Sequence, residues 1–227
     1  MHRRVLMSKS ATARTRDPER TREKLLEAAM VEFATHGLTG AKVERIARRA
    51  GVNKRLVYHY FKGKEQLYGD VLERTYQQIH RREDAINLDA RAPEQALADL
   101  IDRLFERIIA LPHANAVIAD ENLHQARHIK TAPWVKDMHA RLIAQIETML
   151  DAGSAAGIFR PDVDPVRFFI SVLGLCLTYV TNRYTMSVVF SRDLFSPGER
   201  EAWKRHVLDL CLNGLRPVSA ETPRQDA

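Results

Sequence analysis

The sequence predicts an all-α protein in which a three-helix helix-turn-helix domain precedes a larger C-terminal helical domain. Apolar residues recur at helical spacing along most of the 227 residues. No stretch alternates convincingly between apolar and polar residues, so strands are not expected. Near residue 51, a turn containing glycine separates two short helical patterns, as in a helix-turn-helix.

The first 82 residues read as an arm followed by four helices. Residues 1–16 are polar, basic and aperiodic, and we expect a disordered arm there. Asp17 is suited to cap a first helix that starts at Pro18 and ends at Gly37. Apolar and basic residues separate to opposite faces of "AKVERIARRAG", and "NKRLVYHYF" is a helix barely two turns long. A fourth, connecting helix is expected over residues 64–82.

The helix-turn-helix domain is assigned to residues 17–63 and the second domain to residues 83–216. A break at "NLDARAP" separates the connecting helix from the helices of the second domain. The tail over residues 217–227 is polar and is expected to be disordered. Five long helices are predicted in the second domain, over residues 93–110, 114–129, 133–156, 165–189 and 197–215.

Cysteine content and the lengths of apolar runs indicate the compartment. Cys176 and Cys211 both lie in apolar helical stretches, so no disulfide framework is expected and a reducing cytoplasm is the expected location. The most apolar stretch, "FFISVLGLCLTYV", is too short for a membrane span and predicts a buried core helix. The N-terminus lacks the sustained apolar core of a signal peptide, and translation could begin at Met1 or at Met7.

Basic residues are concentrated toward the N-terminus. Residues 1–68 contain 16 Lys and Arg against 7 Asp and Glu, whereas the rest contains 19 against 22, within a net charge of +6. A polyanionic partner for the first part would account for this distribution, and so would a solvated basic surface. Charge alone does not decide between the two.

The aromatic residues of the third helix favour the polyanionic partner. Val57 and Phe61 stand four residues apart and can both pack inward, but one short helix cannot bury all its rings and carry this much positive charge. Tyrosine hydroxyls and lysines contact phosphates, arginine reads guanine edges, and leucine contacts the thymine methyl group. Duplex DNA is therefore the predicted partner, with this helix in the major groove. The residues left outward are Arg55, Leu56, His59 and Tyr60, with Tyr58 at the margin.

Several landmarks between residues 18 and 74 agree in both spacing and residue type. They are Ala28-Ala29, Phe33, Gly37, Ile46-Ala47, Ala50-Gly51-Val52, Tyr60-Phe61, Lys64-Glu65 and Leu67. In this combination the stretch resembles the amino-terminal domain of the TetR/AcrR family of bacterial repressors. The resemblance implies a sequence-specific DNA-binding regulator, most simply a repressor that a small-molecule effector releases from a palindromic operator. Stretches such as "ENLHQARHI" are also similar to the repressors of pyrimidine and nicotinate catabolism.

The resemblance also implies, by position, which residues contact DNA. Arg55 and Leu56 replace the small residues that usually follow the lysine of the turn, so the resemblance does not imply an operator sequence. The residues that the resemblance implies as DNA contacts are Lys42, Arg45, Lys54, Arg55, Leu56, Tyr58, Tyr60 and Lys64. His59 is added because it lies on the outward face of the third helix.

Two further sites are expected in the C-terminal domain, which by the resemblance binds an effector and forms a homodimer. The middle helices should enclose a pocket for a small aromatic or heteroaromatic effector. The last two helices should form a four-helix bundle with a second copy, since "FFISVLGLCLTYV" is apolar nearly all round. The pocket candidates are Tyr76, Asn122, His124, Trp134, Tyr179, Asn182 and Arg183, of which Tyr76 and Trp134 suit core packing as well. The dimer-interface candidates are Phe169, Leu173, Leu208 and Leu212.

Alternative functions find less support. The phosphate-binding, nucleophile-elbow and zinc-protease motifs do not occur, so neither an enzyme nor a cofactor is expected. Glu121, His124 and His128 stand at helical spacing for metal ligands, but a polar stripe is the favoured interpretation and no metal site is predicted.

Arg183 suits a solvated helix end, an effector contact or a subunit contact, and Cys176 suits the core better than a redox sensor. A constitutive architectural DNA-binding protein would not need the large second domain, and no membrane partner is expected.

Overall fold

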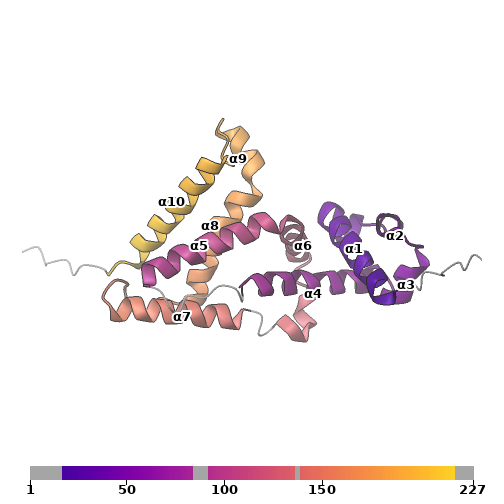
Figure 1. Ribbon diagram of the computed structural model, residues 1–227, viewed down its shortest axis with the longest axis horizontal. Coiled ribbons are helices and arrows are strands. Elements are labelled where there is room, and N and C mark those ends of the chain that lie inside the picture. Colours follow the sequence, from indigo (N-terminus) through magenta and orange to yellow (C-terminus); the bar gives the residue numbers. More distant parts are fainter. Residues whose placement is uncertain (1–16, 84–91, 136–138, 218–227) are drawn as a thin grey trace, which may run out of the picture. The chain divides into compact units, whose positions relative to one another are not determined.

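The computed structural model describes residues 17–83, 92–135 and 139–217. Within those ranges the chain forms ten α-helices, two short 3₁₀ helices and no strand, which confirms the predicted all-α fold (Figure 1). The chain forms two compact units that divide after Tyr68. The expected N-terminal arm, and the expected tail beyond residue 217, lie outside the described residues.

The first unit contains three helices and the start of a fourth. They are α1 (Pro18–Gly40), α2 (Val43–Ala50), α3 (Arg55–Phe61) and α4 (Lys64–Glu83). The division between the two units falls inside α4, so this one helix contributes residues to both.

Polar side chains and glycines define the ends of these helices. Asp17 caps α1 as predicted, because its carboxylate accepts two backbone N–H groups of the first turn at 3.1 and 3.2 Å. Gly37 interrupts α1 with a positive φ (φ 63°, ψ 175°), and Gly51 ends α2 in the left-handed helical conformation (φ 68°, ψ 33°). Asn53 accepts the backbone N–H of Arg55 at 2.9 Å and so starts α3.

A small aromatic core holds α3 against the rest of the first unit. Val57 and Phe61 are buried, as predicted from their spacing. Phe33 of α1 and Tyr68 of α4 meet edge to face, with ring centroids 5.0 Å apart. Burial of each large apolar side chain stabilises the fold by about 1.5–3 kcal/mol. Because this core fixes the inner face of α3, the opposite face must point outward.

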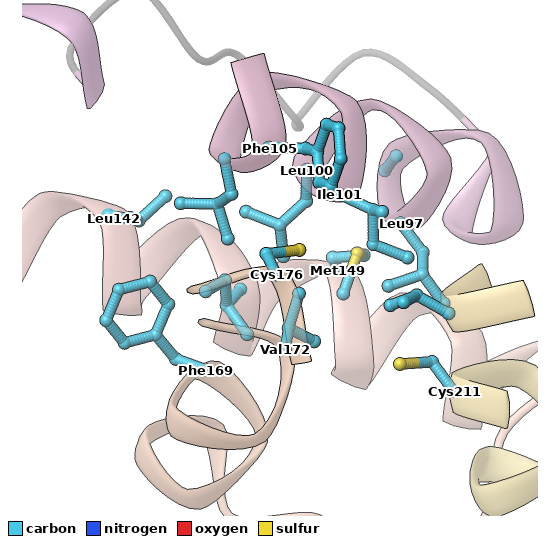
Figure 2. Packing of buried hydrophobic residues seen from close by; sticks show 14 of the residues in the cluster. Leu97, Leu100, Ile101, Phe105, Leu142, Met149, Phe169, Val172, Cys176 and Cys211 are labelled. Carbon is cyan, nitrogen blue, oxygen red and sulfur yellow. The ribbon is translucent and has the colours of Figure 1, made fainter. Parts of the chain in front are cut away.

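The second unit contains the rest of α4 and six further α-helices. These are α5 (Pro93–Ala110), α6 (Pro112–Leu123), α7 (Ala140–Ala155), α8 (Pro165–Thr181), α9 (Arg183–Val189) and α10 (Pro197–Leu215), with 3₁₀ helices at Ile129–Thr131 and Pro133–Val135. α5 packs against α7, α8 and α10. Figure 2 shows Leu100 and Phe105 of α5 facing Cys176 of α8, with Met149 and Cys211 beside them. Cys176 is fully buried and belongs to this core.

The structure places the end of α6 at Leu123, whereas the sequence predicted a helix that continues to Ile129. The chain turns there through two residues with positive φ, Gln125 (58°) and Ala126 (57°), and the N–H of Ala126 donates to the carbonyl of Glu121 at 2.9 Å. The buried Glu121 carboxylate also accepts the backbone N–H groups of His128 (2.7 Å) and Ile129 (3.2 Å). These bonds satisfy a charge that would otherwise be costly to bury, and they stabilise the turn.

The single helices predicted over 133–156 and 165–189 are also wrong. The first starts only at Ala140, after a 3₁₀ turn and residues 136–138, which lie outside the description. The second breaks at Asn182, whose side chain donates to the carbonyl of Thr178 at 3.0 Å, and α8 and α9 meet at a bend of 70°. By length and composition, no single described helix could cross a membrane, although α8 and α9 pass that test as a bent pair.

Candidate nucleic-acid interface and ligand cavity

The outer face of α3 combines positive charge with exposed rings. Tyr58 is 52% exposed although it is aromatic, and the rings of His59 and Tyr60 meet edge to face at 5.0 Å. Hydroxyl, guanidinium and ammonium donors on one face can bond to phosphates and to base edges in a major groove. The exposed residues are Lys54, Arg55, Tyr58 and His59, and the half-buried ones are Leu56 and Tyr60.

The two lysines on either side of α2 are exposed. Lys42 is the residue just before α2, and Lys54 lies in the turn before α3. The Nζ of Lys54 lies 3.5 Å from a carboxylate oxygen of Glu44, and both side chains are more than half exposed. Hydrogen bonding to its own backbone lowers the pKa of Glu44, and the lysine charges lower it further. Such an exposed pair is weak, so Lys54 can exchange Glu44 for a phosphate at little cost.

Arg45, predicted to contact DNA, is half-buried and also bonds within the first unit. Its Nε lies 2.6 Å from a carboxylate oxygen of Glu32, and its Nη2 donates to the carbonyl of Gly40 at 2.8 Å. Glu32 comes from α1, is 3% exposed, and also accepts the backbone N–H of Lys42 at 3.0 Å. Lys42 is the N-cap residue of α2, so the Glu32 carboxylate fixes the backbone at the start of this helix.

Lys64, another predicted DNA contact, is directed at the same turn. Its ammonium group donates to the carbonyls of Thr39 and Ala41, both at 3.3 Å. Lys64 is also the first residue of α4. The turn between α1 and α2 is therefore held from three sides, by groups from α1, α2 and α4.

A cavity of about 520 Å³ lies in the second unit, within the size range of small-molecule sites. Its walls are mainly apolar, and the rings of His139 and Phe169 lie side by side with centroids 5.7 Å apart. Arg107 is the only lining residue with a permanent charge among those that the structure describes. The lining residues are Tyr76, Ile79, Arg107, Ile108, Asn115, Ile118, Ala119, Asn122, His139, Phe169, Leu173, Leu177 and Thr181.

Two of the seven predicted pocket residues, Tyr76 and Asn122, line this cavity. Trp134 lies behind Tyr76, with ring centroids 5.3 Å apart, and so supports the wall without lining it. Burial raises the pKa of Tyr76, and the charge of the nearby Glu121 raises it further. The hydroxyl of Tyr76 therefore stays protonated and can donate a hydrogen bond.

The other four predicted pocket residues do not line this cavity. His124 turns back to a carbonyl of α6 at 2.8 Å. Tyr179 is buried with its ring stacked on Trp203 at 4.5 Å, in the core between α8 and α10. Asn182 ends α8, and Arg183 lines an adjoining cavity of about 410 Å³.

The predicted dimer-interface residues of α8 point inward. Phe169 is 6% exposed and, together with Leu173, lines the cavity. Ile170, one residue later than Phe169 and so about 100° further round the helix, is 60% exposed. A stretch that is apolar nearly all round does not reveal from sequence which face is inside. The α10 candidates, Leu208 and Leu212, are half-buried against the core.

The possible metal ligands Glu121, His124 and His128 do not converge. Glu121 bonds to His128, whose Nδ1 lies 2.9 Å from a carboxylate oxygen, whereas His124 turns away. The helix ends at Leu123, so helical spacing does not extend to residue 128. No group of three His, Cys, Asp or Glu side chains within the described ranges could hold a metal ion.

Comparison with known families covers both units. Residues 25–71 match the family described as "Bacterial regulatory proteins, tetR family", and residues 93–211 match "Tetracyclin repressor-like, C-terminal domain". The chain belongs to the TetR family. The HTH-type transcriptional repressor NicS of Pseudomonas putida is 31% identical to it over 211 residues, which cover 93% of this chain and 100% of NicS.

Solved structures share the TetR fold. The putative regulator SCO4942 of Streptomyces coelicolor superposes with a TM-score of 0.63 at 24% identity, over 87% of this chain and 99% of that one. The regulator FadR of Bacillus subtilis, solved in complex with stearoyl-CoA, gives a TM-score of 0.60 at 20% identity, over 86% and 99% of the two chains. At these identities the likeness shows the fold alone.

The cavity of this TetR-family protein contains polar residues that the sequence analysis missed. Arg107, Asn115 and His139 all line it, on or next to three different helices. The apolar pattern of α5 is weak evidence that Arg107 faces inward, because Arg107 stands beside the buried Ile108 at the edge of the apolar face. His139 directly precedes α7 and carried no such signal.

Proposed function

We propose that this TetR-family protein is a transcriptional repressor, not an enzyme. As a homodimer it binds a palindromic operator through α3, and an effector in the 520 Å³ cavity releases it. The observation that carries the proposal is the outer face of α3, where exposed Lys54, Arg55, Tyr58 and His59 lie over the buried Val57 and Phe61. A DNA partner of this kind implies action in the cytoplasm.

Exposure and charge indicate which residues would contact bases and which would contact phosphates. Arg55 is the candidate for base recognition, since a guanidinium can bond to both acceptors of guanine in the major groove. Lys42, Lys54 and the hydroxyls of Tyr58 and Tyr60 are candidates for phosphate contacts. Arg45 and Lys64 act indirectly, because they hold the turn in front of α2.

A homodimer accounts for the outward apolar residues of α8 and α10. Val166 and Ile170 of α8 and Leu210 of α10 are 47%, 60% and 47% exposed. Pairing of these helices with their copies about a two-fold axis would form a four-helix bundle. Two copies of α3 related by that axis require an operator with two-fold symmetry.

The switch is proposed to run through α4. This helix is continuous from Lys64, which bonds to the α1–α2 turn, to Tyr76 and Ile79, which line the cavity. An effector weakens DNA binding only if it binds better to the conformation that fits DNA poorly. Coupling of about 1–3 kcal/mol, or roughly 5- to 150-fold in operator affinity, is typical. The rings of Tyr76, His139 and Phe169 favour a small aromatic or heteroaromatic effector.

Footprinting of the DNA upstream of its own and neighbouring genes tests the proposal. We expect a protected inverted repeat, with an affinity that falls steeply as salt rises. Arg55→Ala should weaken binding roughly 5- to 150-fold, because about 1–3 kcal/mol of base recognition is lost. Arg103→Ala, which removes an exposed arginine from α5, should leave binding unchanged. The absence of any protected repeat would reject the proposal.

A further inference from the structure

A carboxylate lies beside the start of α3, among cations. Glu44 belongs to the first turn of α2, its side chain is 63% exposed, and its carboxylate lies 3.5 Å from the Nζ of Lys54. Lys54 is the N-cap residue of α3. In a helix-turn-helix, the N-terminal residues of the second helix contact base edges in the major groove. Glu44 therefore lies next to the end of α3 that would meet the bases.

A second feature shows that the same face of α2 adjoins α3. Arg48 stands four residues after Glu44, so the two side chains lie on one face of α2. Arg48 is exposed, and together with Thr21, Asn53 and Leu56 it lines a hollow of about 310 Å³ at the turn between α2 and α3. The face of α2 that carries Glu44 thus continues into the surface at the start of α3.

The negative charge of Glu44 determines which part of DNA it fits. Hydrogen bonding to its own backbone, and the neighbouring lysine charges, lower the pKa of Glu44, so it is ionised at neutral pH. Phosphates would repel it, and so would the acceptor atoms that guanine and thymine present in the major groove. The amino group of cytosine is a donor there, and a carboxylate accepts from it. Adenine also has an amino group, but its N7 acceptor lies beside it.

We propose that Glu44 is a specificity-determining residue, whose carboxylate accepts a hydrogen bond from the amino group of a cytosine in each operator half-site. This inference rests on the proposed function, because it takes α3 to lie in the major groove of an operator. On DNA, Lys54 would leave Glu44 for a phosphate, and the cytosine amino group would replace it at the carboxylate. The exchange costs little, because an exposed ion pair is weak.

The place of Glu44 in the helix also suits a purely structural role. An acidic residue in the first turn is stabilised by the positive end of the helix dipole. That effect would change the stability of the protein but not its preference among bases. Base preference is therefore the readout that separates the two roles.

Synthetic duplexes test the proposal on the full-length dimer. They carry the inverted repeat that footprinting protects, with each base pair of one half-site replaced in turn. Wild-type protein should bind roughly 5- to 150-fold more weakly when the cytosine is replaced. Glu44→Gln should lose this discrimination and accept adenine at that position, because a glutamine amide pairs with both polar groups of the adenine edge. Glu44→Ala should lose it and gain no new preference. If both variants kept the wild-type preference at every base pair, the proposal would be overturned.

Lys54→Ala distinguishes Glu44 from the lysine beside it. Loss of a phosphate contact should weaken binding to all the duplexes by a similar factor and reduce the dependence of affinity on salt, while the cytosine preference remains. A lysine can also read guanine, the partner of that cytosine. Loss of the preference in Lys54→Ala would therefore make Lys54 the reader and overturn the assignment to Glu44. Glu147→Gln removes an exposed glutamate from α7 and should bind every duplex as the wild type does.

Footprinting separates this inference from the proposed function. If the wild-type protein protects no inverted repeat, the proposed function fails and this inference fails with it. If a repeat is protected and the Glu44 variants keep its base preferences, the repressor function stands and the role of Glu44 is wrong.

Discussion

Glu32 shows how one buried carboxylate can organise a DNA-binding unit. It is 3% exposed, lies 2.6 Å from Arg45 Nε and accepts the backbone N–H of Lys42 at 3.0 Å. A buried charge is tolerated only when such donors satisfy it. The side chain thus joins α1 to the start of α2, and α2 in turn supports α3.

Glu32→Gln should reduce the free energy of unfolding by about 1–3 kcal/mol, because Arg45 loses its charged partner. Operator affinity should fall as well, since the start of α2 is held less firmly. Urea unfolding and gel-shift titration measure the two effects. The control is Glu44→Gln, whose side chain is 63% exposed and should change stability by less than about 0.5 kcal/mol. If both variants were equally stable, Glu32 would not position α2.

The two cysteines should be inert in the folded protein. Burial raises the pKa of Cys176 to about 12 and that of Cys211 to about 11, from an ordinary value of 9.0. Because the thiolate is the reactive form, an aromatic disulfide reagent at about pH 8 should label neither thiol in native protein, and both in urea. Rapid labelling of Cys176 in the native protein would contradict this prediction and favour a redox-sensor role.

The same pKa shifts determine how these thiols affect stability at alkaline pH. Their folded-state pKa lies above the unfolded value, so the unfolded chain loses these protons first. Their contribution to stability is therefore complete below about pH 9 and is lost as pH rises through about 11–12. Urea unfolding at increasing pH should show stability falling above about pH 9.

At the scale of helices, the first unit could be predicted from sequence and the second only in outline. Caps such as Asp17, turn glycines such as Gly51 and the inward pair Val57 and Phe61 are local signals, and the structure contains all of them. The break at Asn182 was missed because it depends on side-chain bonds at the α8–α9 bend, which apolar periodicity does not report.

The cavity was predicted least well, for a related physical reason. Its lining comes from α4, α5, α6 and α8, with His139 just before α7, and no single helix pattern shows which faces leave a space between them. Phe169 and Leu173 were assigned to the dimer interface because a helix that is apolar all round has no polar face to mark the outside. The bonds that Arg45 and Lys64 make within the first unit could not be predicted, because the carbonyls and the carboxylate that accept them are distant in the sequence.

Helix α7 is closely packed at Gly153. A Cβ added at Gly153 would lie 2.7 Å from Cγ of Phe159 and closer still to two other atoms of that buried ring. Gly153→Ala should therefore reduce the free energy of unfolding by about 1–3 kcal/mol, although alanine is the better helix former. Thermal or urea unfolding measures the change.

Gly69→Ala is the matched control for this packing effect. Gly69 lies in α4, and a Cβ there would meet nothing within 4 Å. The alanine should stabilise the protein by up to about 1 kcal/mol, the ordinary gain for glycine in a helix. Stabilisation by both variants would mean that Phe159 moves aside and that α7 is not tightly packed.

At the scale of the whole molecule, exposed apolar residues concentrate in one part of the chain. Of the large apolar side chains that are exposed among the described residues, all but Tyr58 and Leu123 lie between residues 166 and 210. They belong to α8, α9 with the residue that ends it, and α10. Exposed apolar patches on soluble proteins mark interaction sites. A second copy would cover this surface and pair two copies of α3.

Ile170→Glu should therefore convert the dimer to monomers, measured by light scattering. Ile170 is 60% exposed, so the substitution should hardly change the stability of a single copy. In a dimer it would bury an unpaired charge. Operator affinity should fall as well, since each monomer must bind its half-site without the gain from being linked to the other. Binding of a cavity ligand should persist, because Ile170 is not among the lining residues.

Leu123→Glu makes the same chemical change at a leucine that is 83% exposed on α6, and it should remain dimeric. The comparison separates the effect of position from the effect of added charge on dimerisation, because both variants put one carboxylate in place of one exposed aliphatic side chain. A dimer that survived Ile170→Glu would move the interface away from this face of α8. The exposed Tyr184, Val188 and Phe190 around α9 would then be the next surface to test. The palindromic operator would still require a two-fold axis, but a different pair of helices would form it.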